Sequence, residues 1–119
     1  MSEASCGTDD SQKRTARIRE LNDLFRRSFV GGRVVFTSGV RALGVAKVAA
    51  LLQRLRTFNE FSADNDPYGE HDFGAFEEAG RRFFWKIDAY DPAVQYGSED
   101  PADPSKTCRV LTLMLAHEY

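Results

Sequence analysis

The feature that most constrains the fold lies within residues 64–91, where two strand-forming segments flank a tight turn at Ala79-Gly80. The second segment is strongly aromatic, with Phe83-Phe84-Trp85 in a row. Apolar and β-forming residues on both sides of a glycine-containing turn predict an antiparallel β-hairpin. One acidic loop precedes the first strand of this hairpin and another follows the second strand. The position of the hairpin therefore determines where both loops lie.

The register of the hairpin decides which side chains are buried, because a slip of one residue reverses both faces. We expect a three-residue loop, Glu78 to Gly80, with Gly80 in the left-handed conformation that this turn requires. This register sets Phe73 opposite Trp85, and Ala75 opposite Phe83. The expected core face is His71, Phe73, Ala75, Phe83, Trp85 and Ile87. The expected polar face is Glu70, Asp72, Phe84, Lys86, Asp88 and Tyr90.

The other elements follow from hydrophobic periodicity. Ile18, Leu21 and Phe25 predict a first helix that ends before Gly31-Gly32, with its arginines on a solvated face beside Glu20 and Asp23. Residues 33–37 predict a short strand, and residues 45–59 predict a second helix. Residues 107–116 alternate like a strand buried inside the sheet, although Asp103-Pro104 just before them is also typical of a helix start.

These elements predict an α+β fold, with two helices packed on a three- to four-stranded antiparallel sheet around a central aromatic hairpin. The length of 119 residues suits one domain over residues 11–119, preceded by a disordered tail over residues 1–10. The N-terminus has no basic and apolar secretory signal, and no apolar run approaches membrane-spanning length. We therefore expect a cytoplasmic protein without membrane contact.

The net charge of −2 hides a strong asymmetry along the chain. Residues 1–58 hold 11 Lys and Arg against 5 Asp and Glu, whereas residues 59–119 hold 5 against 13. Loops of one charge sign create fields that select partners and steer association. Two interpretations are open: the acidic loops bind a partner, or they only keep a small protein soluble.

The alternative to a binding role is a small hydrolase or metal-dependent enzyme that uses the cluster of Glu70, His71, Asp72, Lys86 and Asp88. Carboxylates, an imidazole and a lysine are groups that catalyse hydrolysis or proton transfer. The simpler interpretation is an Asp72–Lys86 pair on a solvated face, with a structural histidine. The loop also lacks the spacing of a calcium-binding EF-hand, so we expect neither a metal nor a cofactor.

Two features invite a nucleic-acid interpretation: the arginines of the first helix, and the aromatics of the hairpin. Duplex DNA attracts clustered arginines, and single strands stack on exposed aromatic rings. The nearby acidic loops would repel phosphate, and Phe83 and Trp85 fit a core better. We therefore expect no direct binding of nucleic acid, and regard Phe84 and Tyr90 as interface aromatics.

The segment from Asn65 to Phe76, the strand Phe84-Trp85-Lys86-Ile87-Asp88 and the run from Ser98 to Ala116 together resemble one bacterial family. The similarity extends back through Gly32 to Arg17, and so covers nearly the whole chain after the tail. The family is a small domain of unknown function, found mainly in alphaproteobacteria and often on plasmids. Its association with mobile elements implies a protein that inhibits host defence, as anti-CRISPR and anti-restriction proteins do.

The sequence therefore predicts a non-enzymatic interaction protein that occupies a basic, nucleic-acid-binding surface on a partner protein, such as a CRISPR or restriction component. The acidic loops and the polar face of the hairpin would make the contact. The expected partner-binding residues are Asp64, Asp66, Tyr68, Glu70, Asp72, Phe84, Lys86, Asp88, Tyr90, Glu99, Asp100 and Asp103.

Overall fold

A computed structural model describes residues 2–119, with side chains for residues 10–119. The elements, in chain order, are helix α1 (Ser2–Ser28), strand β1 (Gly32–Phe36), helix α2 (Ser38–Arg41), helix α3 (Val45–Arg56), strands β2 (Phe73–Glu78) and β3 (Arg81–Tyr90), 3₁₀ turn η1 (Pro104–Lys106), strand β4 (Cys108–Leu115) and 3₁₀ turn η2 (Ala116–Glu118). The fold is α+β, as the sequence predicts. The predicted connection over residues 38–44 contains the short helix α2.

The sheet has the strand order β1-β4-β3-β2. Strand β4 lies between β1 and β3, which confirms the prediction of an interior strand near the C-terminus. The pairs β2–β3 and β3–β4 are antiparallel, but β1 and β4 are parallel, so the prediction of an antiparallel sheet is wrong for this pair. Parallel neighbours need a long crossover, and here α2, α3 and the hairpin lie between the two strands in the chain.

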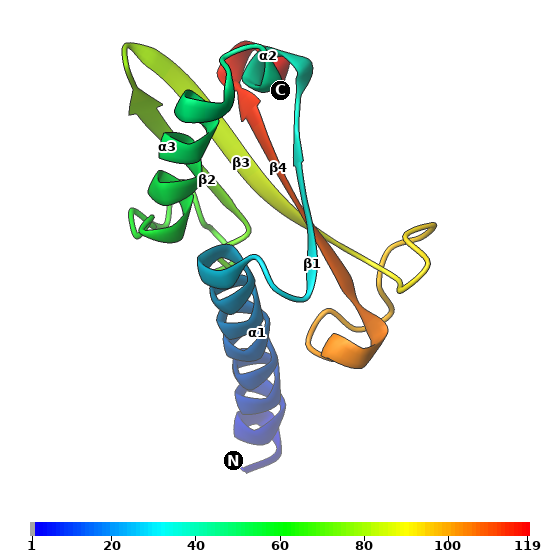
Figure 1. The fold of residues 1–119 in the computed structure, drawn as a ribbon. Helices are drawn as coiled ribbons and strands as arrows, with labels where there is room; N and C mark the ends of the chain where they lie inside the picture. The colour runs from blue at the N-terminus through cyan, green and yellow to red at the C-terminus, as the bar shows by residue number, and fades with distance from the viewer. Residues whose placement is uncertain (1) are drawn as a thin grey trace.

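The core lies on one face of the sheet, the side on which Figure 1 shows α1 and α3. Phe83, Trp85 and Ile87 of β3 alternate toward this face, and all three are buried. Phe25 of α1 and Leu51 and Leu55 of α3 pack against them. Burial of such side chains contributes about 1.5–3 kcal/mol each, which makes this layer the main source of stability.

The opposite face, called here the open sheet face, carries the alternate side chains of the four strands. These are Arg33 and Val35 of β1, Val110, Thr112 and Met114 of β4, Phe84, Lys86, Asp88 and Tyr90 of β3, and Phe73, Ala75 and Glu77 of β2. The C-terminal Tyr119 lies against it, with its ring centroid 5.5 Å from that of Phe84 and 5.9 Å from that of Phe73. Among residues 10–119, the buried core cluster takes its members from the other face.

The hairpin has a two-residue turn, so the predicted three-residue loop is wrong. Ala79 and Gly80 both have positive φ, 53° and 79°, as the twist of a tight hairpin requires. The pairs are Phe73–Lys86, Gly74–Trp85 and Phe76–Phe83. The faces of β3 are as predicted, whereas those of β2 are reversed: Phe73 lies on the open sheet face and Phe76 in the core.

Two physical contacts explain this register. Gly74 has no side chain where the Trp85 indole needs space, and it is buried against that ring. Glu77 and Glu78 lie opposite Arg82 and Arg81, so opposite charges face each other across the strands. The prediction considered the glycine only as a turn former at position 80, and overlooked the glycine inside the strand.

Arg26 corrects a second prediction, because it is fully buried instead of lying on a solvated helix face. Its Nε donates to the Leu55 carbonyl and its Nη2 to the Phe58 carbonyl, each at 3.0 Å, near the C-terminal end of α3. Nη1 lies 2.8 Å from Asp23 Oδ1. The guanidinium thus adds hydrogen bonds to carbonyls at the end of α3, where intrahelical donors run out, and it holds α1 against α3.

Residues 1–9 lie outside the described side chains, and residues 2–9 enter the structure only as backbone of α1. The disordered tail expected over residues 1–10 therefore stays a prediction. Within residues 2–119, none of the helices combines the length and apolarity of a membrane span.

Replacing Gly74 with alanine tests the hairpin register. A Cβ atom at this position would lie 2.7 Å from Phe58 Cζ and closer still to Trp85 Nε1, and Trp85 is fully buried. We expect Gly74→Ala to lower the free energy of unfolding by about 1–3 kcal/mol in urea titrations, because overpacking strains the core.

Gly97→Ala is the matched control, since a Cβ there meets no atom within 4 Å. It should change stability by less than about 0.5 kcal/mol. Equal stability of the two variants would contradict the pairing of Gly74 with Trp85.

Candidate functional site

The two acidic loops, residues 62–72 and 91–107, both lie against α1. Arg14 Nη2 lies 3.2 Å from Asp100 Oδ1 in the second loop. In the first loop, Arg19 donates to the Gly69 carbonyl and Asn22 to the Glu70 carbonyl, each at 2.9 Å. The basic helix therefore partly neutralises the acidic half of the chain.

His71 fixes the first loop to α1. Its Nδ1 lies 2.9 Å from Asp23 Oδ1, and its ring stacks on Phe61 with the centroids 3.6 Å apart. Asp66, which is 9% exposed, accepts a 3.1 Å hydrogen bond from the His71 amide and lies 3.6 Å from Nε2. These contacts hold His71 at a φ of 55°, a left-handed conformation that is costly for a non-glycine residue.

Burial raises the pKa of Asp23, but hydrogen bonds and charge from Arg26 and His71 outweigh burial and hold the pKa below its ordinary value. A lowered pKa means that the ionised carboxylate stabilises the fold. This stabilisation is present above the ordinary pKa of aspartate and is lost as the pH falls through the lowered one.

Carboxylates of the second loop also shape their own backbone. Asp100 Oδ1 accepts from the Ala102 amide at 3.2 Å, and Asp103 Oδ1 accepts from the Ser105 amide at 2.9 Å. Side-chain and backbone hydrogen bonds from Ser105 hold the pKa of Asp103 below its ordinary value. These two predicted partner-binding residues thus have a structural role in turns.

The loop residues that remain free to meet a partner are fewer. Asp64 and Glu99 are exposed and form no ion pair with the side chains of residues 10–119. Tyr68 is 80% exposed, and Tyr96 is 73% exposed. The sequence prediction missed Tyr96, although an aromatic residue between polar loop residues was a usable signal.

A pocket of about 200 Å³ lies where α1, both loops and β3 meet. Its lining includes three of the predicted site residues, Glu70, Asp72 and Asp88, and also Arg109, Asn22 and Pro101. The 4% exposed Arg109 donates from Nε to Asn22 Oδ1 at 2.6 Å and from Nη2 to the Pro101 carbonyl. Among residues 10–119, no carboxylate lies within ion-pair distance of Arg109.

The surroundings of Glu70 and Asp72 in the pocket disfavour the ionised form of both carboxyl groups. Burial raises the pKa of Glu70, and repulsion from Asp72 raises it further. Burial also raises the pKa of Asp72, together with the charges of Asp66 and Asp88. A raised pKa moves a carboxyl group toward the range in which general acids and bases work.

The predicted acid–base cluster is divided between two places. Glu70, Asp72 and Asp88 share the pocket, but His71 points to Asp23 and Asp66. Lys86 Nζ lies 3.2 Å from Asp88 Oδ2, on the open sheet face.

Arg109 was missed by sequence reasoning, although a charged residue inside the apolar run 107–116 was a visible signal. Within residues 10–119, no group of three or more His, Cys, Asp or Glu is arranged to hold a metal ion.

The hairpin residues predicted to bind a partner lie together on the open sheet face. Phe84, Lys86, Asp88 and Tyr90 project from β3 and are partly exposed. Phe73 and Tyr119 join Phe84 in an aromatic cluster, which the predicted register hid because it placed Phe73 in the core. The sequence offered no periodic signal for Tyr119, since it follows the last strand.

Asp66→Ala should destabilise the protein, because it removes the buried carboxylate that accepts the hydrogen bond of the His71 amide. The expected loss is about 1–3 kcal/mol of unfolding free energy, measured by urea denaturation. Asp64→Ala, two residues away and exposed, should change it by less than about 0.5 kcal/mol. Two equally stable variants would contradict the structural role of Asp66.

Glu70→Gln should stabilise the protein at neutral pH. Because the folded pKa of Glu70 is raised above its ordinary value of 4.5, the protonated form is favoured in the fold, and its contribution is lost as the pH rises through the folded value. The variant should therefore melt at a higher temperature than wild type near pH 7, and at the same temperature near pH 3.

Glu60→Gln, at an exposed carboxylate, serves as the control and should leave the melting temperature unchanged at both pH values. A Glu70→Gln protein that is less stable than wild type near pH 7 would contradict the unfavourable placement of this carboxylate.

Comparison with known proteins identifies the family but no activity. A family model described as "Protein of unknown function (DUF3768)" matches residues 36–118, which include α3, the hairpin, both acidic loops and β4. No curated protein and no solved structure matches the chain. The predicted resemblance to a domain of unknown function is thereby confirmed. The chain belongs to the DUF3768 family of proteins of unknown function.

Proposed function

We propose that this chain is a non-enzymatic protein-interaction module, which binds its partner through the open sheet face and the adjoining acidic loops. The observation that carries the proposal is that the buried core cluster occupies one face of the sheet, while the other presents an aromatic cluster of Phe73, Phe84 and Tyr119. Aromatic side chains at the centre of a patch are typical anchors of protein interfaces.

The aromatic cluster combines exposed aromatic rings with a neighbouring guanidinium and apolar surface, as protein interfaces do. Tyr119 is 74% exposed, and its ring meets Phe84 edge-on at an interplanar angle of 89°. The Arg82 guanidinium lies 5.8 Å from the Phe84 ring centroid, at the edge of the cluster. Val35 extends the apolar surface onto β1 and is 37% exposed. A partner would bury apolar area here without unfolding any element.

Charge in the acidic loops favours a partner with a basic surface. Asp64 and Glu99 are exposed without an ion pair to residues 10–119, and Asp88 lies at the edge of the open sheet face. Complementary charge raises the association rate and the specificity of such complexes. Asp66, Asp72, Asp100 and Asp103 would contribute mainly through loop shape and the local field.

The most concrete version of this proposal is an anti-defence inhibitor, which acts in the cytoplasm on a CRISPR or restriction protein. Such a protein carries a basic surface for nucleic acid, and a rigid acidic module can cover that surface. Two observations support this version. Residues 59–119 carry an excess of acidic residues, and the chain resembles a family that is associated with mobile elements. No cofactor and no direct contact with nucleic acid are needed.

The pocket carries a second candidate function, that of a small acid–base enzyme. Glu70 and Asp72 with raised pKa values, beside the buried Arg109, favour it. It would use Glu70 and Asp72, without His71 or Lys86, and without Asp88, because the Asp88 carboxylate lies beside Lys86 on the open sheet face. If Glu70→Gln is more stable than wild type but inactive in cells, the pocket and not the open sheet face carries the function.

The inhibitor proposal predicts protection of incoming DNA. Host cells with an active CRISPR or restriction system, challenged with a targeted plasmid, should be transformed more often when they express the wild-type protein. Val35→Lys on the open sheet face, and the double variant Asp64→Lys/Glu99→Lys in the acidic loops, should each lower this protection at least about tenfold, equivalent to 1.4 kcal/mol of binding energy.

Gln53→Lys, on the exposed side of α3, is the matched control and should protect like wild type. All variants should keep the wild-type melting temperature. Full protection by both surface variants would contradict the proposed surface, and absence of protection by wild type would contradict the anti-defence version.

A further inference from the structure

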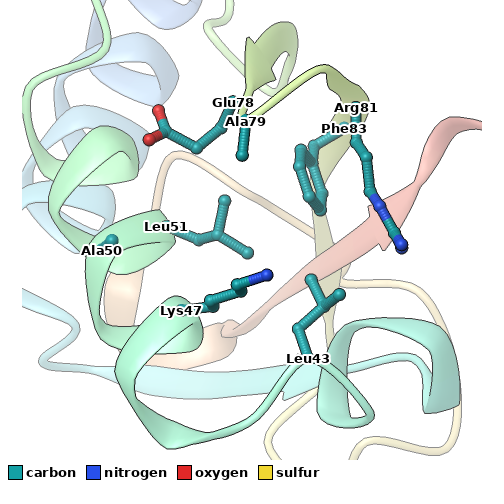
Figure 2. Close-up of a pocket in the computed structure, with 8 residues that line it drawn as sticks. All are labelled: Leu43, Lys47, Ala50, Leu51, Glu78, Ala79, Arg81 and Phe83. Carbon is teal, nitrogen blue, oxygen red and sulfur yellow. The ribbon is translucent and has the colours of Figure 1, made fainter.

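A small recess lies between α3 and the tip of the β2–β3 hairpin, at the end of the hairpin remote from the acidic loops. Its volume is about 90 Å³. Leu43, Leu51 and Phe83 form its walls, and Lys47, Glu78 and Arg81 lie around them (Figure 2). None of its lining residues belongs to the pocket beside Arg109 or is among the residues named above for the open sheet face, so the recess is separate from both sites.

The walls are rigid and apolar. Leu51 is 1% exposed and Phe83 is 2% exposed, so both belong to the packed core and cannot turn away. An engineered apolar cavity of about 150 Å³ takes up benzene. The smaller recess therefore suits the branched end of an aliphatic chain better than an aromatic ring.

The charges around the recess favour an anion. Lys47 and Arg81 are exposed and form no ion pair with the side chains of residues 10–119. Figure 2 shows the Lys47 amine pointing toward the space between Leu51 and Leu43. The Glu78 carboxylate points away from that space, and its Oε1 lies 2.9 Å from Arg54 Nη1. Glu78, the acidic residue among those that line the recess, is thus already paired with Arg54.

We propose that this recess binds a small branched aliphatic monocarboxylate. The alkyl end fills the space between Leu43, Leu51 and Phe83, and the carboxylate lies between Lys47 and Arg81. Apolar walls beside two cations that form no ion pair with residues 10–119 favour this ligand over a neutral apolar molecule and over a small inorganic anion. The proposal does not depend on the proposed interaction function.

The test is a titration of the isotopically labelled full chain with 4-methylpentanoate, followed by NMR. The methyl signals of Leu43 and Leu51 should shift in a saturable manner, with a dissociation constant in the millimolar range that suits so small a ligand. Acetate, which lacks the alkyl end, and 4-methylpentanamide, which lacks the charge, should bind more weakly. Absence of shifts at Leu43 and Leu51, or equal binding of the amide, would overturn the proposal.

Substitution of the cations tests their role without disturbing the core. Lys47→Gln and Arg81→Gln should each weaken binding about threefold, as expected for solvent-exposed ion pairs. Arg41→Gln, an exposed cation on α2 outside the recess, should leave the affinity unchanged. Wild-type affinity in the double variant Lys47→Gln/Arg81→Gln would contradict the assignment.

A protein that ends in leucine carries the same branched alkyl group and carboxylate as the proposed free acid. A second ligand distinguishes these two sources. Acetyl-Gly-Gly-Leu with a free carboxylate should bind no better than 4-methylpentanoate. Clearly tighter binding of this peptide would overturn the assignment to a free acid, and would indicate that the recess binds the C-terminus of a protein.

Discussion

The buried guanidinium of Arg26 is the interaction on which the arrangement of the rest depends. A buried charge is tolerated only when its donors are satisfied, and Arg26 meets this condition with the Leu55 carbonyl of α3, the Phe58 carbonyl just after that helix, and the Asp23 carboxylate of its own helix. Its guanidinium also lies 5.3 Å from the Phe61 ring centroid and 5.4 Å from that of Trp85. One side chain therefore fixes α1 relative to α3, the first acidic loop and the sheet.

The position of α1 in turn determines how the charge of the chain is distributed. Because α1 lies between the two loops, Arg14 and Arg19 contact the acidic half of the chain directly. The asymmetry of the sequence is thus partly cancelled within the fold, and the carboxylates left free are those at exposed loop positions such as Asp64 and Glu99. This cancellation makes the open sheet face the stronger candidate for a binding surface, because no helix of the described chain packs over its apolar and aromatic side chains.

Local pattern was sufficient to predict β1 and α3, because each combines a clear period with turn residues at its ends. For residues 107–116 alternation favoured the strand β4, but Asp103-Pro104 also favoured a helix start, and these residues begin only the 3₁₀ turn η1. The hairpin register required knowledge of which side chain faces Gly74, and that depends on Trp85 eleven residues later. The burial of Arg26 and the pocket around Arg109 depend on contacts between segments remote in the chain. For the same reason the acidic residues were recognised as a group, but their division into structural caps, pocket carboxylates and free charges was not.

Side-chain oxidation footprinting of the protein, alone and in complex with the partner captured from host cells, tests the central claim most directly. If the open sheet face is the binding surface, Phe84 and Tyr119 lose reactivity in the complex, while Leu24, 55% exposed on α1, keeps its reactivity. Protection of Leu24 with unchanged oxidation of Phe84 and Tyr119 would place the partner on the helices, and would contradict the account.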